Sequence, residues 1–392
     1  MSELNITCNQ DIKEYDLFDN MDLKLNLLKG IFSHGFEKPS PVQKKAIVPI
    51  IKGTECIVHA QSGVGKTGVF SIAMLQVIDE SINATQGIIV APTRDLAQQI
   101  DSVISSIGKY LKISTAVCIG GTSINDNIAS LEKKPHFIIG TPGRIIDMIE
   151  RNVLDTSSLK ILTLDEADEL LSKGFKEQIR NIVRHLPTNI HINLFSATFP
   201  QEVVDLSKSF MNNPVVFNVK KEQLTLEGIK QFYITVDKEE WKLHTLIDLY
   251  NTISVSQAII FVNRKEKCNY LLEELTQRNF TVSIFSSELS QKERYNLIEQ
   301  FKSGATRVLI TTDVLSRGID AQHVSIVINY DIPKNNEIDV YLHRIGRSGR
   351  YGRKGVAINF VTYYDQRRLQ EIERFYSTTI DEMPQDVSNL IT

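Results

Sequence analysis

Short runs of β-branched and other apolar residues alternate along the chain with stretches in which apolar residues recur at helical spacing. In the first half, these patterns predict strands at Glu55–His59, Gly87–Ala91, Ala116–Ile119, Phe137–Gly140, Ile161–Leu164 and Ile192–Phe195, with helices that begin at Lys66 and Arg94. Strands and helices that alternate in this way form parallel sheets with helices on both faces. The pattern therefore predicts an α/β fold.

The alternation breaks once, in a charged stretch that we interpret as a linker over 219–230, and then resumes. The second half has predicted strands at Phe232–Val236, Ala258–Val262 and Val356–Val361, and predicted helices at Glu239–Asn251 and near Gln366–Phe375. We therefore expect two domains, 1–218 and 231–392. The length of 392 residues fits this division, since a domain has roughly 100–200 residues.

Composition narrows the class of protein. A hydrophobic fraction of 42% is enough for two cores, while the apolar runs are too short to span a bilayer and the polar N-terminus does not resemble a signal peptide. The net charge of −3 means that a nucleic acid would have to be held by a local groove with specific contacts.

The four cysteines, Cys8, Cys56, Cys118 and Cys268, lie far apart and form no CxxC pair. The last three lie in or beside apolar runs, so we expect buried thiols rather than metal ligands or disulfides. This use of cysteine indicates a reducing compartment. We expect a cytoplasmic protein, with the nucleus as the alternative.

A glycine-rich segment, Ala60–Thr67, follows a predicted strand and opens a predicted helix. In this context small residues let backbone N–H groups approach phosphates, and the helix N-terminus adds positive potential. Lys66 is expected to reach the β and γ phosphates and Thr67 to bind Mg²⁺. The predicted nucleotide-binding residues of the loop are Gln61, Ser62, Gly63, Val64, Gly65, Lys66 and Thr67.

An acidic run, Asp165–Asp168, ends the predicted strand Ile161–Leu164. Ligands of open parallel sheets bind at the carboxyl ends of the strands, where the phosphate loop also lies. We therefore assign Asp165 to the metal ion and Glu166 as the general base that activates water.

Together with further motifs, these segments make the chain similar to the DEAD-box RNA helicases over about residues 16–392. The additional motifs are Phe18 with Gly35–Gln43, Pro92–Ala97, Gly120–Gly121, Thr141–Arg144, Ser196–Thr198, Phe261–Arg264, Thr311–Asp313, Arg317–Asp320 and His343–Arg350. The resemblance implies two tandem RecA-like domains, ATP as the nucleotide, and local separation of RNA strands without movement along the duplex.

The resemblance also implies residue roles. Gln43 would read the adenine edge with its amide, Phe18 would stack on the base, and Lys38, Gly318 and Asp320 would complete the nucleotide site. RNA-backbone contacts that read shape rather than sequence fall to Pro92, Thr93, Arg94, Gly120, Gly121, Thr141, Gly143 and Arg144, and in the second domain to Arg264 and Thr311.

Arg347 and Arg350 match the family's finger motif, which faces the γ-phosphate from the second domain. Such a finger accelerates hydrolysis by about 10³–10⁵, so the resemblance implies that hydrolysis waits for the two domains to close. Coupling between ATP and RNA is assigned to Asp168, Ser196, Thr198 and His343, with a hydrogen bond expected between the Ser196–Thr198 segment and Asp168.

Three segments depart from the family pattern. Val64 stands where the family usually has Thr, at a position expected to be peripheral to the phosphates. Phe285–Glu288 replaces a His-Gly-acid run and puts one RNA contact in doubt. Lys334–Leu342 is about two residues longer than usual.

The leading functional prediction is an ATP-dependent RNA helicase that acts on messenger RNA in translation initiation, as a monomer with a scaffold protein bridging both domains. One alternative stays open: a clamp that ATP locks onto RNA in an mRNA-processing, exon-junction-type or ribosome-biogenesis assembly. A DNA helicase is disfavoured because Gln43, Ser196–Thr198 and the finger motif together fit the RNA enzymes.

Overall fold

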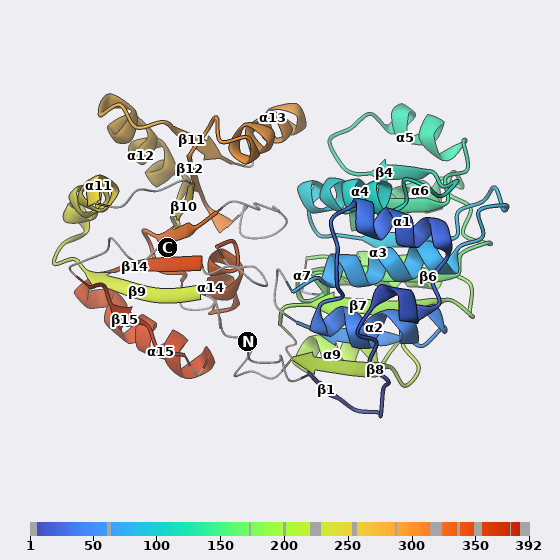
Figure 1. Ribbon diagram of the computed structural model, residues 1–392. Coiled ribbons are helices and arrows are strands. Elements are labelled where there is room, and N and C mark those ends of the chain that lie inside the picture. Colours follow the sequence, from blue (N-terminus) through green and yellow to red (C-terminus); the bar gives the residue numbers. More distant parts are fainter. Residues whose placement is uncertain are drawn as a thin grey trace. The chain divides into compact units, whose positions relative to one another are not determined.

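The computed structural model describes residues 6–60, 64–171, 174–198, 201–219, 229–252, 257–286, 288–313, 324–334, 338–348, 355–376 and 378–384. The chain divides into two units, Met1–Lys220 and Lys221–Thr392 (Figure 1). Each unit is a parallel sheet with helices on both faces, which confirms the predicted α/β class.

The sheet of the first unit has eight strands among the described residues, in the order β1-β8-β2-β7-β6-β3-β5-β4. The strands are β1 (Ile6–Cys8), β2 (Cys56–His59), β3 (Gly87–Val90), β4 (Thr115–Cys118), β5 (Phe137–Gly140), β6 (Ile161–Asp165), β7 (His191–Ser196) and β8 (Val215–Val219). All strand pairs are parallel except β1 with β8.

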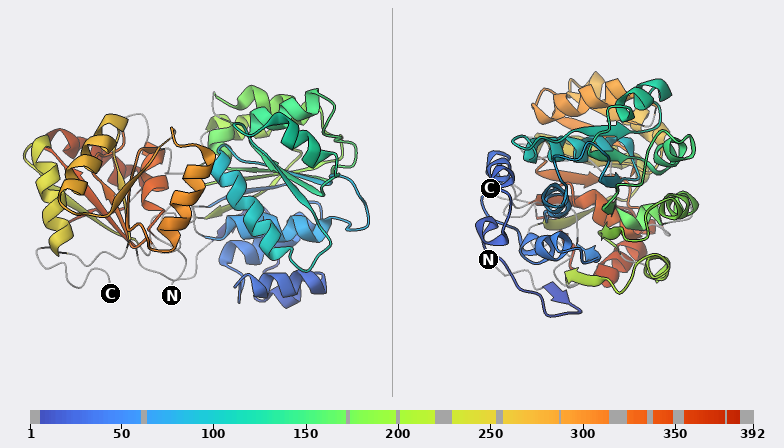
Figure 2. Two further views of the ribbon diagram at one scale, coloured as in Figure 1. Left: turned by 90° about the horizontal axis from the view of Figure 1, so that it is seen from above. Right: turned by 90° about the vertical axis from the view of Figure 1, so that its right-hand side faces the viewer.

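Helices cover both faces of this sheet, as Figure 2 shows from above. The helices are α1 (Leu25–Ser33), α2 (Pro41–Ile51), α3 (Lys66–Val77), α4 (Arg94–Ile107), α5 (Ile124–Leu131), α6 (Pro142–Glu150), α7 (Ala167–Leu170), α8 (Lys176–Arg184) and α9 (Gln201–Ser207), with a 3-10 turn η1 at Phe18–Met21. Helices α6, α8 and α9 enclose one apolar core against the strands, while α1 to α4 pack together on the other side.

Strand β1 is a feature that the sequence pattern did not predict. It runs antiparallel to β8 and covers the edge of the sheet, so the backbone groups of β8 are paired rather than exposed. The side chain of Asn9 holds the chain there, because its Oδ1 accepts from the Val216 amide at 2.9 Å and its Nδ2 donates to the Pro214 carbonyl at 3.3 Å.

The second unit has a seven-stranded sheet among the described residues, in the order β11-β12-β10-β13-β14-β9-β15. Its strands are β9 (Ile229–Thr235), β10 (Ala258–Phe261), β11 (Val282–Phe285), β12 (Val308–Thr311), β13 (Ile326–Asn329), β14 (Gly355–Val361) and β15 (Asp381–Glu382). Every pair is parallel, as predicted for a βαβ arrangement.

Two cores lie on opposite faces of this sheet. Helices α11 (Lys242–Thr252) and α12 (Lys265–Gln277) form one with the strands, and α13 (Gln291–Lys302), α14 (Ile338–Ile345) and α15 (Gln366–Tyr376) form the other. Two short 3-10 turns, η2 (Glu239–Trp241) and η4 (Tyr363–Asp365), lead into α11 and α15.

Two element boundaries differ from the prediction. Strand β9 begins at Ile229 rather than Phe232, because it pairs along its whole length with β14 from Gly355 to Val361. The predicted helix Glu239–Asn251 is divided into η2 and α11. The middle of the predicted linker, 220–228, lies outside the described residues, and the domain limits 1–218 and 231–392 stay a prediction.

The cysteine prediction is confirmed for the three internal positions. Cys56, Cys118 and Cys268 are buried free thiols, while Cys8 is half-buried. Burial raises the pKa of Cys118 to about 12 and that of Cys268 to about 11, which makes both thiols poor nucleophiles. None of the helices in the described part of the chain is long and apolar enough to cross a membrane.

A close helix contact gives the first prediction. A Cβ on Gly30 of α1 would overlap the carbonyl oxygen of Ile107 at the end of α4. We expect Gly30→Ala to lower the free energy of unfolding by about 1–3 kcal/mol, the usual cost of overpacking, measured by chemical denaturation.

The matched control is Gly174→Ala, since no atom lies within 4 Å of a Cβ built there. This substitution should change the free energy of unfolding by less than about 0.5 kcal/mol. Equal effects of the two substitutions would contradict the α1–α4 packing.

Candidate functional site

The end of the phosphate loop is the first part of the candidate site. Gly65 has φ 99°, a left-handed conformation that glycine adopts without strain, and α3 begins at the next residue. Lys66 is only 7% exposed, and its Nζ has no hydrogen-bond partner among the described residues. A buried, unpaired ammonium group is costly unless an anion binds it. Val64 is buried and Thr67 half-buried. The predicted residues Gln61, Ser62 and Gly63 lie outside the described residues.

Two buried carboxyl groups follow β6. Asp165 and Glu166 are 4% and 5% exposed. Burial raises the pKa of Asp165 to about 7, Lys66 acts against this rise, and the neighbouring Glu166 adds to it. Glu166 has φ 52°, a left-handed conformation that a non-glycine residue keeps only when its surroundings enforce it.

These groups fit a magnesium–nucleotide ligand. The buried Lys66 ammonium suits phosphate oxygens, and the raised pKa of Asp165 shows a crowded acidic site that a divalent cation would relieve. No cluster of three or more His, Cys, Asp or Glu side chains in the described ranges could hold a metal ion by itself. Mg²⁺ commonly takes one or two carboxylates together with substrate phosphates and water.

The predicted hydrogen bond between Asp168 and the Ser196–Thr198 segment is present. The Thr198 hydroxyl donates to Asp168 Oδ2 at 2.5 Å, and the Asp168 amide donates to Ser196 Oγ at 3.3 Å. Ser196 ends β7, and its carbonyl accepts from the amide of Ala60 at 2.9 Å. The end of β7 therefore contacts both the acidic run and the start of the phosphate loop.

Gln43 lies against the phosphate loop. Its Oε1 accepts from the Ser40 amide at 2.8 Å, within a capping box that begins α2, and its Nε2 donates to the Gly65 carbonyl at 3.2 Å. A Cβ on Gly65 or on Gly68 would meet the same Nε2. One N–H and one lone pair of the amide are still available to a base.

The other two adenine-site candidates differ in exposure. Phe18 is 1% exposed, with its ring stacked on Phe36 at a centroid distance of 6.5 Å and edge-on to Phe32 at 6.4 Å. Phe36 is half-buried and packs beside Gly68. Lys38 is exposed. Base stacking by Phe18 and nucleotide binding by Lys38 stay predictions.

The predicted RNA residues of the first unit follow the carboxyl ends of β3, β4 and β5. Thr93 caps α4, and the Arg94 guanidinium lies over Gly120 and Gly121, where a Cβ on Gly121 would overlap it. Only Pro92 is buried, while Thr93, Arg94, Gly120, Gly121, Thr141, Gly143 and Arg144 are half-buried or exposed. Parallel pairing of the three strands brings these residues to one edge of the sheet.

Arg144 is held by residues that the sequence reasoning did not single out. Its guanidinium donates to the Thr122 carbonyl at 3.1 Å, to the Thr122 hydroxyl at 3.3 Å, and to Asn127 Oδ1. Asn127 is buried and donates in turn to the Val117 carbonyl at 3.1 Å. No spacing rule in the sequence indicated this support.

In the second unit, the centre of the polar network is Arg344, which has no exposed surface. Its guanidinium donates to both carboxylate oxygens of Asp313, at 2.6 and 3.0 Å, to Asn263 Oδ1 at 2.8 Å, and to the Asp331 carbonyl at 2.7 Å. Each partner belongs to, or follows, a different strand. The sequence reasoning quoted Arg344 within a motif but assigned it no role.

The remaining second-unit candidates have mixed environments. His343 is buried, and Arg347 is half-buried with its Nε donating to the His343 carbonyl at 3.2 Å. Arg264 precedes α12. Thr311 is fully buried and its hydroxyl bonds to backbone carbonyl oxygens, so its predicted RNA contact stays a prediction. Gly318, Asp320 and Arg350 lie outside the described residues.

One departure from the family pattern has a structural role. Phe285 is buried, with the Arg294 guanidinium 5.8 Å from the centre of its ring, and Glu288 pairs with Lys265. Ser287 and the middle of the Lys334–Leu342 segment, 335–337, lie outside the described residues.

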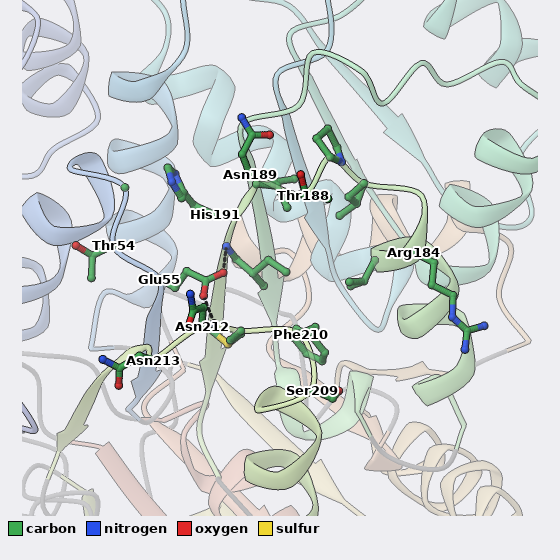
Figure 3. Close-up of a pocket in the computed structure, with 17 residues that line it drawn as sticks. Thr54, Glu55, Arg184, Thr188, Asn189, His191, Ser209, Phe210, Asn212 and Asn213 are labelled. Atoms are coloured by element: carbon green, nitrogen blue, oxygen red, sulfur yellow. Dashed lines mark hydrogen bonds between the residues drawn. The ribbon is translucent and has the colours of Figure 1, made fainter.

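The first unit also has a surface pocket of about 820 Å³, remote from these residues (Figure 3). It lies where β2 and β7 begin, whereas the predicted site residues follow the strand ends. Glu55 organises its wall by accepting from the Ile192 amide at 3.1 Å and the Asn212 amide at 2.5 Å. None of the predicted site residues lines it, so the pocket is separate from the candidate site.

Comparison with known proteins agrees with this geometry. The sequence pattern of the DEAD/DEAH box helicase family matches residues 40–206, and that of the helicase conserved C-terminal domain matches residues 241–352. The chain is 54% identical over 389 residues to the ATP-dependent RNA helicase eIF4A of Neurospora crassa, covering 99% of this chain and 97% of that protein. It is 53% identical over 377 residues to eukaryotic initiation factor 4A of Drosophila melanogaster, covering 96% and 93%.

Solved structures show the same architecture. S. cerevisiae Dbp5 bound to RNA and ADP BeF3 matches with a TM-score of 0.88 and 36% identity, covering 94% of this chain and 95% of that chain. Mss116p bound to ssRNA and AMP-PNP matches with a TM-score of 0.85 and 28% identity, covering 95% and 81%. The predicted tandem RecA-like fold is confirmed.

Asp165 gives a prediction on pH. Its pKa is about 7 in the folded chain and about 3.9 in an unfolded one. A raised folded pKa stabilises the fold at pH below about 4, and this contribution is lost as the pH rises to 7. We therefore expect ligand-free Asp165→Asn to melt at a higher temperature than the unmodified chain at pH 8, with the difference shrinking toward pH 4.

The control is Asp155→Asn, because the amide of Ser157 holds the pKa of the Asp155 carboxyl below its ordinary value. That contribution is present at pH above about 4 and is lost in acid, so the control variant should melt lower than the unmodified chain at pH 8. A melting temperature for Asp165→Asn below that of the unmodified chain at pH 8 would show that Asp165 is not a strained buried acid.

Proposed function

The chain belongs to the family of DEAD/DEAH box helicases, and we propose that it is an RNA-stimulated ATPase that separates short RNA duplexes locally, acting on messenger RNA in translation initiation. The relatives named initiation factor 4A support this role, since they match over nearly the whole chain. The observation that carries the proposal is the buried Lys66 ammonium beside the buried Asp165 and Glu166 carboxyl groups.

Each of these groups has a distinct task. Lys66 and the N-terminal amides of α3 bind the phosphates of ATP, and Gln43 positions the loop through its bond to Gly65. Thr67 and Asp165 would hold Mg²⁺, which supplies charge neutralisation at the phosphates when bound. Glu166 orients the attacking water and accepts its proton. Its left-handed backbone is consistent with a geometry kept for function.

The bonds around Asp168 support a coupling role. Thr198 and Ser196 contact Asp168, two residues after the general base, so a change in the acidic run reaches the end of β7 directly. We assign Arg347 and Arg350 as finger residues that act on the γ-phosphate, and His343 to the coupling of this segment. The bidentate Arg344–Asp313 pair holds the start of that segment in place.

RNA is the proposed polynucleotide, bound through its backbone by the residues that follow β3, β4 and β5. Two solved relatives are bound to RNA or ssRNA, and S. cerevisiae Dbp5 also has a solved complex with Gle1 and IP6. We extend this to the chain as a monomer in the cytoplasm, whose activity a scaffold protein bridging both units controls.

Glu166→Gln tests the assignment of the general base. The amide cannot accept a proton, so we expect the RNA-stimulated kcat for ATP to fall by about 10²–10⁴ while nucleotide affinity is kept. Phosphate release and fluorescent-nucleotide binding measure the two quantities. Glu169→Gln, in the same helix α7, serves as the control with near-normal turnover. Normal ATP hydrolysis by Glu166→Gln would refute the mechanism.

The choice of polynucleotide gives a separate prediction. Single-stranded RNA should stimulate ATP hydrolysis at least tenfold more than DNA of the same sequence, because 2′-hydroxyl contacts distinguish the two. A coupled ATPase assay compares them. Release of labelled RNA, followed with ATP and with a non-hydrolysable analogue, separates the unwinding enzyme from the clamp alternative. Residence times of minutes in the presence of ATP would favour the clamp.

A further inference from the structure

Three large aromatic side chains of the second unit are unusually exposed. Trp241 ends η2 with 49% of its surface exposed, and Tyr363 and Tyr364 lie in η4 with 76% and 90% exposed. Aromatic side chains bury 150–250 Å² each when they pack, so leaving three in water gives up much stabilisation. Exposed apolar groups that gather at one place commonly mark an interaction surface.

The fold brings these residues together from distant parts of the sequence. Strands β9 and β14 run parallel in register, with Thr235 opposite Val361, and the Val236 amide donates to the Val361 carbonyl at 2.8 Å. The chain therefore leaves both strands at the same edge and enters η2 and η4 side by side. Lys242 joins the two turns, because its buried Nζ lies 2.9 Å from Glu239 and 3.9 Å from Asp365.

The exposure of the tyrosines follows from the way η4 is closed. Thr362 donates to Asp365 Oδ2 from both its amide, at 3.0 Å, and its hydroxyl, at 2.7 Å. This capping box turns Asp365 inward. The two residues between them, Tyr363 and Tyr364, are left on the outside with their rings edge-on at 5.8 Å.

The surface also carries unneutralised negative charge. Glu239 and Asp365 are neutralised by Lys242, but Asp237 and Glu240 are exposed and form no ion pair among the described residues. The Trp241 ring already takes a cation from the chain itself, since Lys238 Nζ lies 5.8 Å from its centre. Aromatic faces flanked by free carboxylates are the two features that a guanidinium group binds.

We propose that the aromatic–acidic surface, formed by Asp237–Trp241 with Tyr363 and Tyr364, binds an arginine-bearing segment of a partner protein. The planar guanidinium stacks on the rings while its N–H groups pair with Asp237 and Glu240. Tryptophan, tyrosine and arginine dominate the energetically important positions of protein interfaces. RNA is disfavoured here because its phosphates would face the same carboxylates. The inference deepens the proposed scaffold binding.

The chain offers a direct reporter, because Trp241 is its single tryptophan. The probe is a fluorescein-labelled synthetic peptide of alternating arginine and glycine–serine spacers, titrated into the full-length protein. Anisotropy follows the peptide, and Trp241 emission is read with the unlabelled peptide. We expect saturable binding that changes Trp241 emission, and no binding of the same peptide with glutamate in place of arginine.

Two double variants remove the two halves of the surface. Tyr363→Ser with Tyr364→Ser removes the rings, and Asp237→Lys with Glu240→Lys reverses the charge. Each should weaken peptide binding at least tenfold. Tyr110→Ser is the matched control, because Tyr110 is 45% exposed on the first unit and has Lys109 over its ring at 5.8 Å, the same arrangement as Lys238 and Trp241. It should bind the peptide normally.

Other outcomes are decisive as well. Equal affinity in all variants, no saturable binding, or binding without a change in Trp241 emission would overturn the inference. If a uridine oligonucleotide changes Trp241 emission and the ring variant loses RNA affinity, the surface binds RNA instead.

RNA-stimulated ATP hydrolysis and the melting temperature are measured in parallel on every variant, and both should stay normal because no substituted residue belongs to the nucleotide or RNA sites. Failure of the unmodified chain to hydrolyse ATP would reject the proposed function and leave the peptide result standing.

Discussion

Parallel pairing of strands is the constraint on which the functional geometry depends. Because every strand of a parallel sheet points the same way, the residue that follows each strand arrives at the same edge. In the first unit this places Ala60, Asp165 and Ser196 together, and the bonds from Ala60 to Ser196 and from Asp168 to Ser196 join them. In the second unit the same rule gathers Asn263, Asp313 and Asp331 around Arg344.

The two units use buried charge in opposite ways. Arg344 is fully buried, but its donors meet Asp313, Asn263 and a backbone carbonyl, so the charge is satisfied within the unit and holds several loops together. Lys66 is buried with no hydrogen-bond partner among the described residues. The first arrangement stabilises a fold, and the second gains stability only when an anion arrives. This contrast distinguishes a structural network from a binding site without reference to any ligand.

The acidic run shows the cost of such a site. Asp165 keeps a pKa near 7 because burial and Glu166 outweigh Lys66, and Glu166 keeps a left-handed backbone. Both features are unfavourable in the ligand-free chain. The Thr198–Asp168 bond at 2.5 Å and the Asp165 contact with the Glu166 amide at 3.0 Å hold this arrangement in place. Strain and support therefore lie within four residues of each other.

The sequence by itself determined the α/β class, most strand positions, and the chemical identity of the nucleotide site, because period and motif spacing are local properties. Only the tertiary structure decided what each side chain meets. Phe18 is enclosed by Phe32 and Phe36, Thr311 spends its hydroxyl on backbone carbonyls, and β1 covers an edge that no local pattern announced. Arg344 and the pairing of Trp241 with Tyr363 and Tyr364 depend on strands distant in sequence, and such contacts are set by packing rather than by spacing.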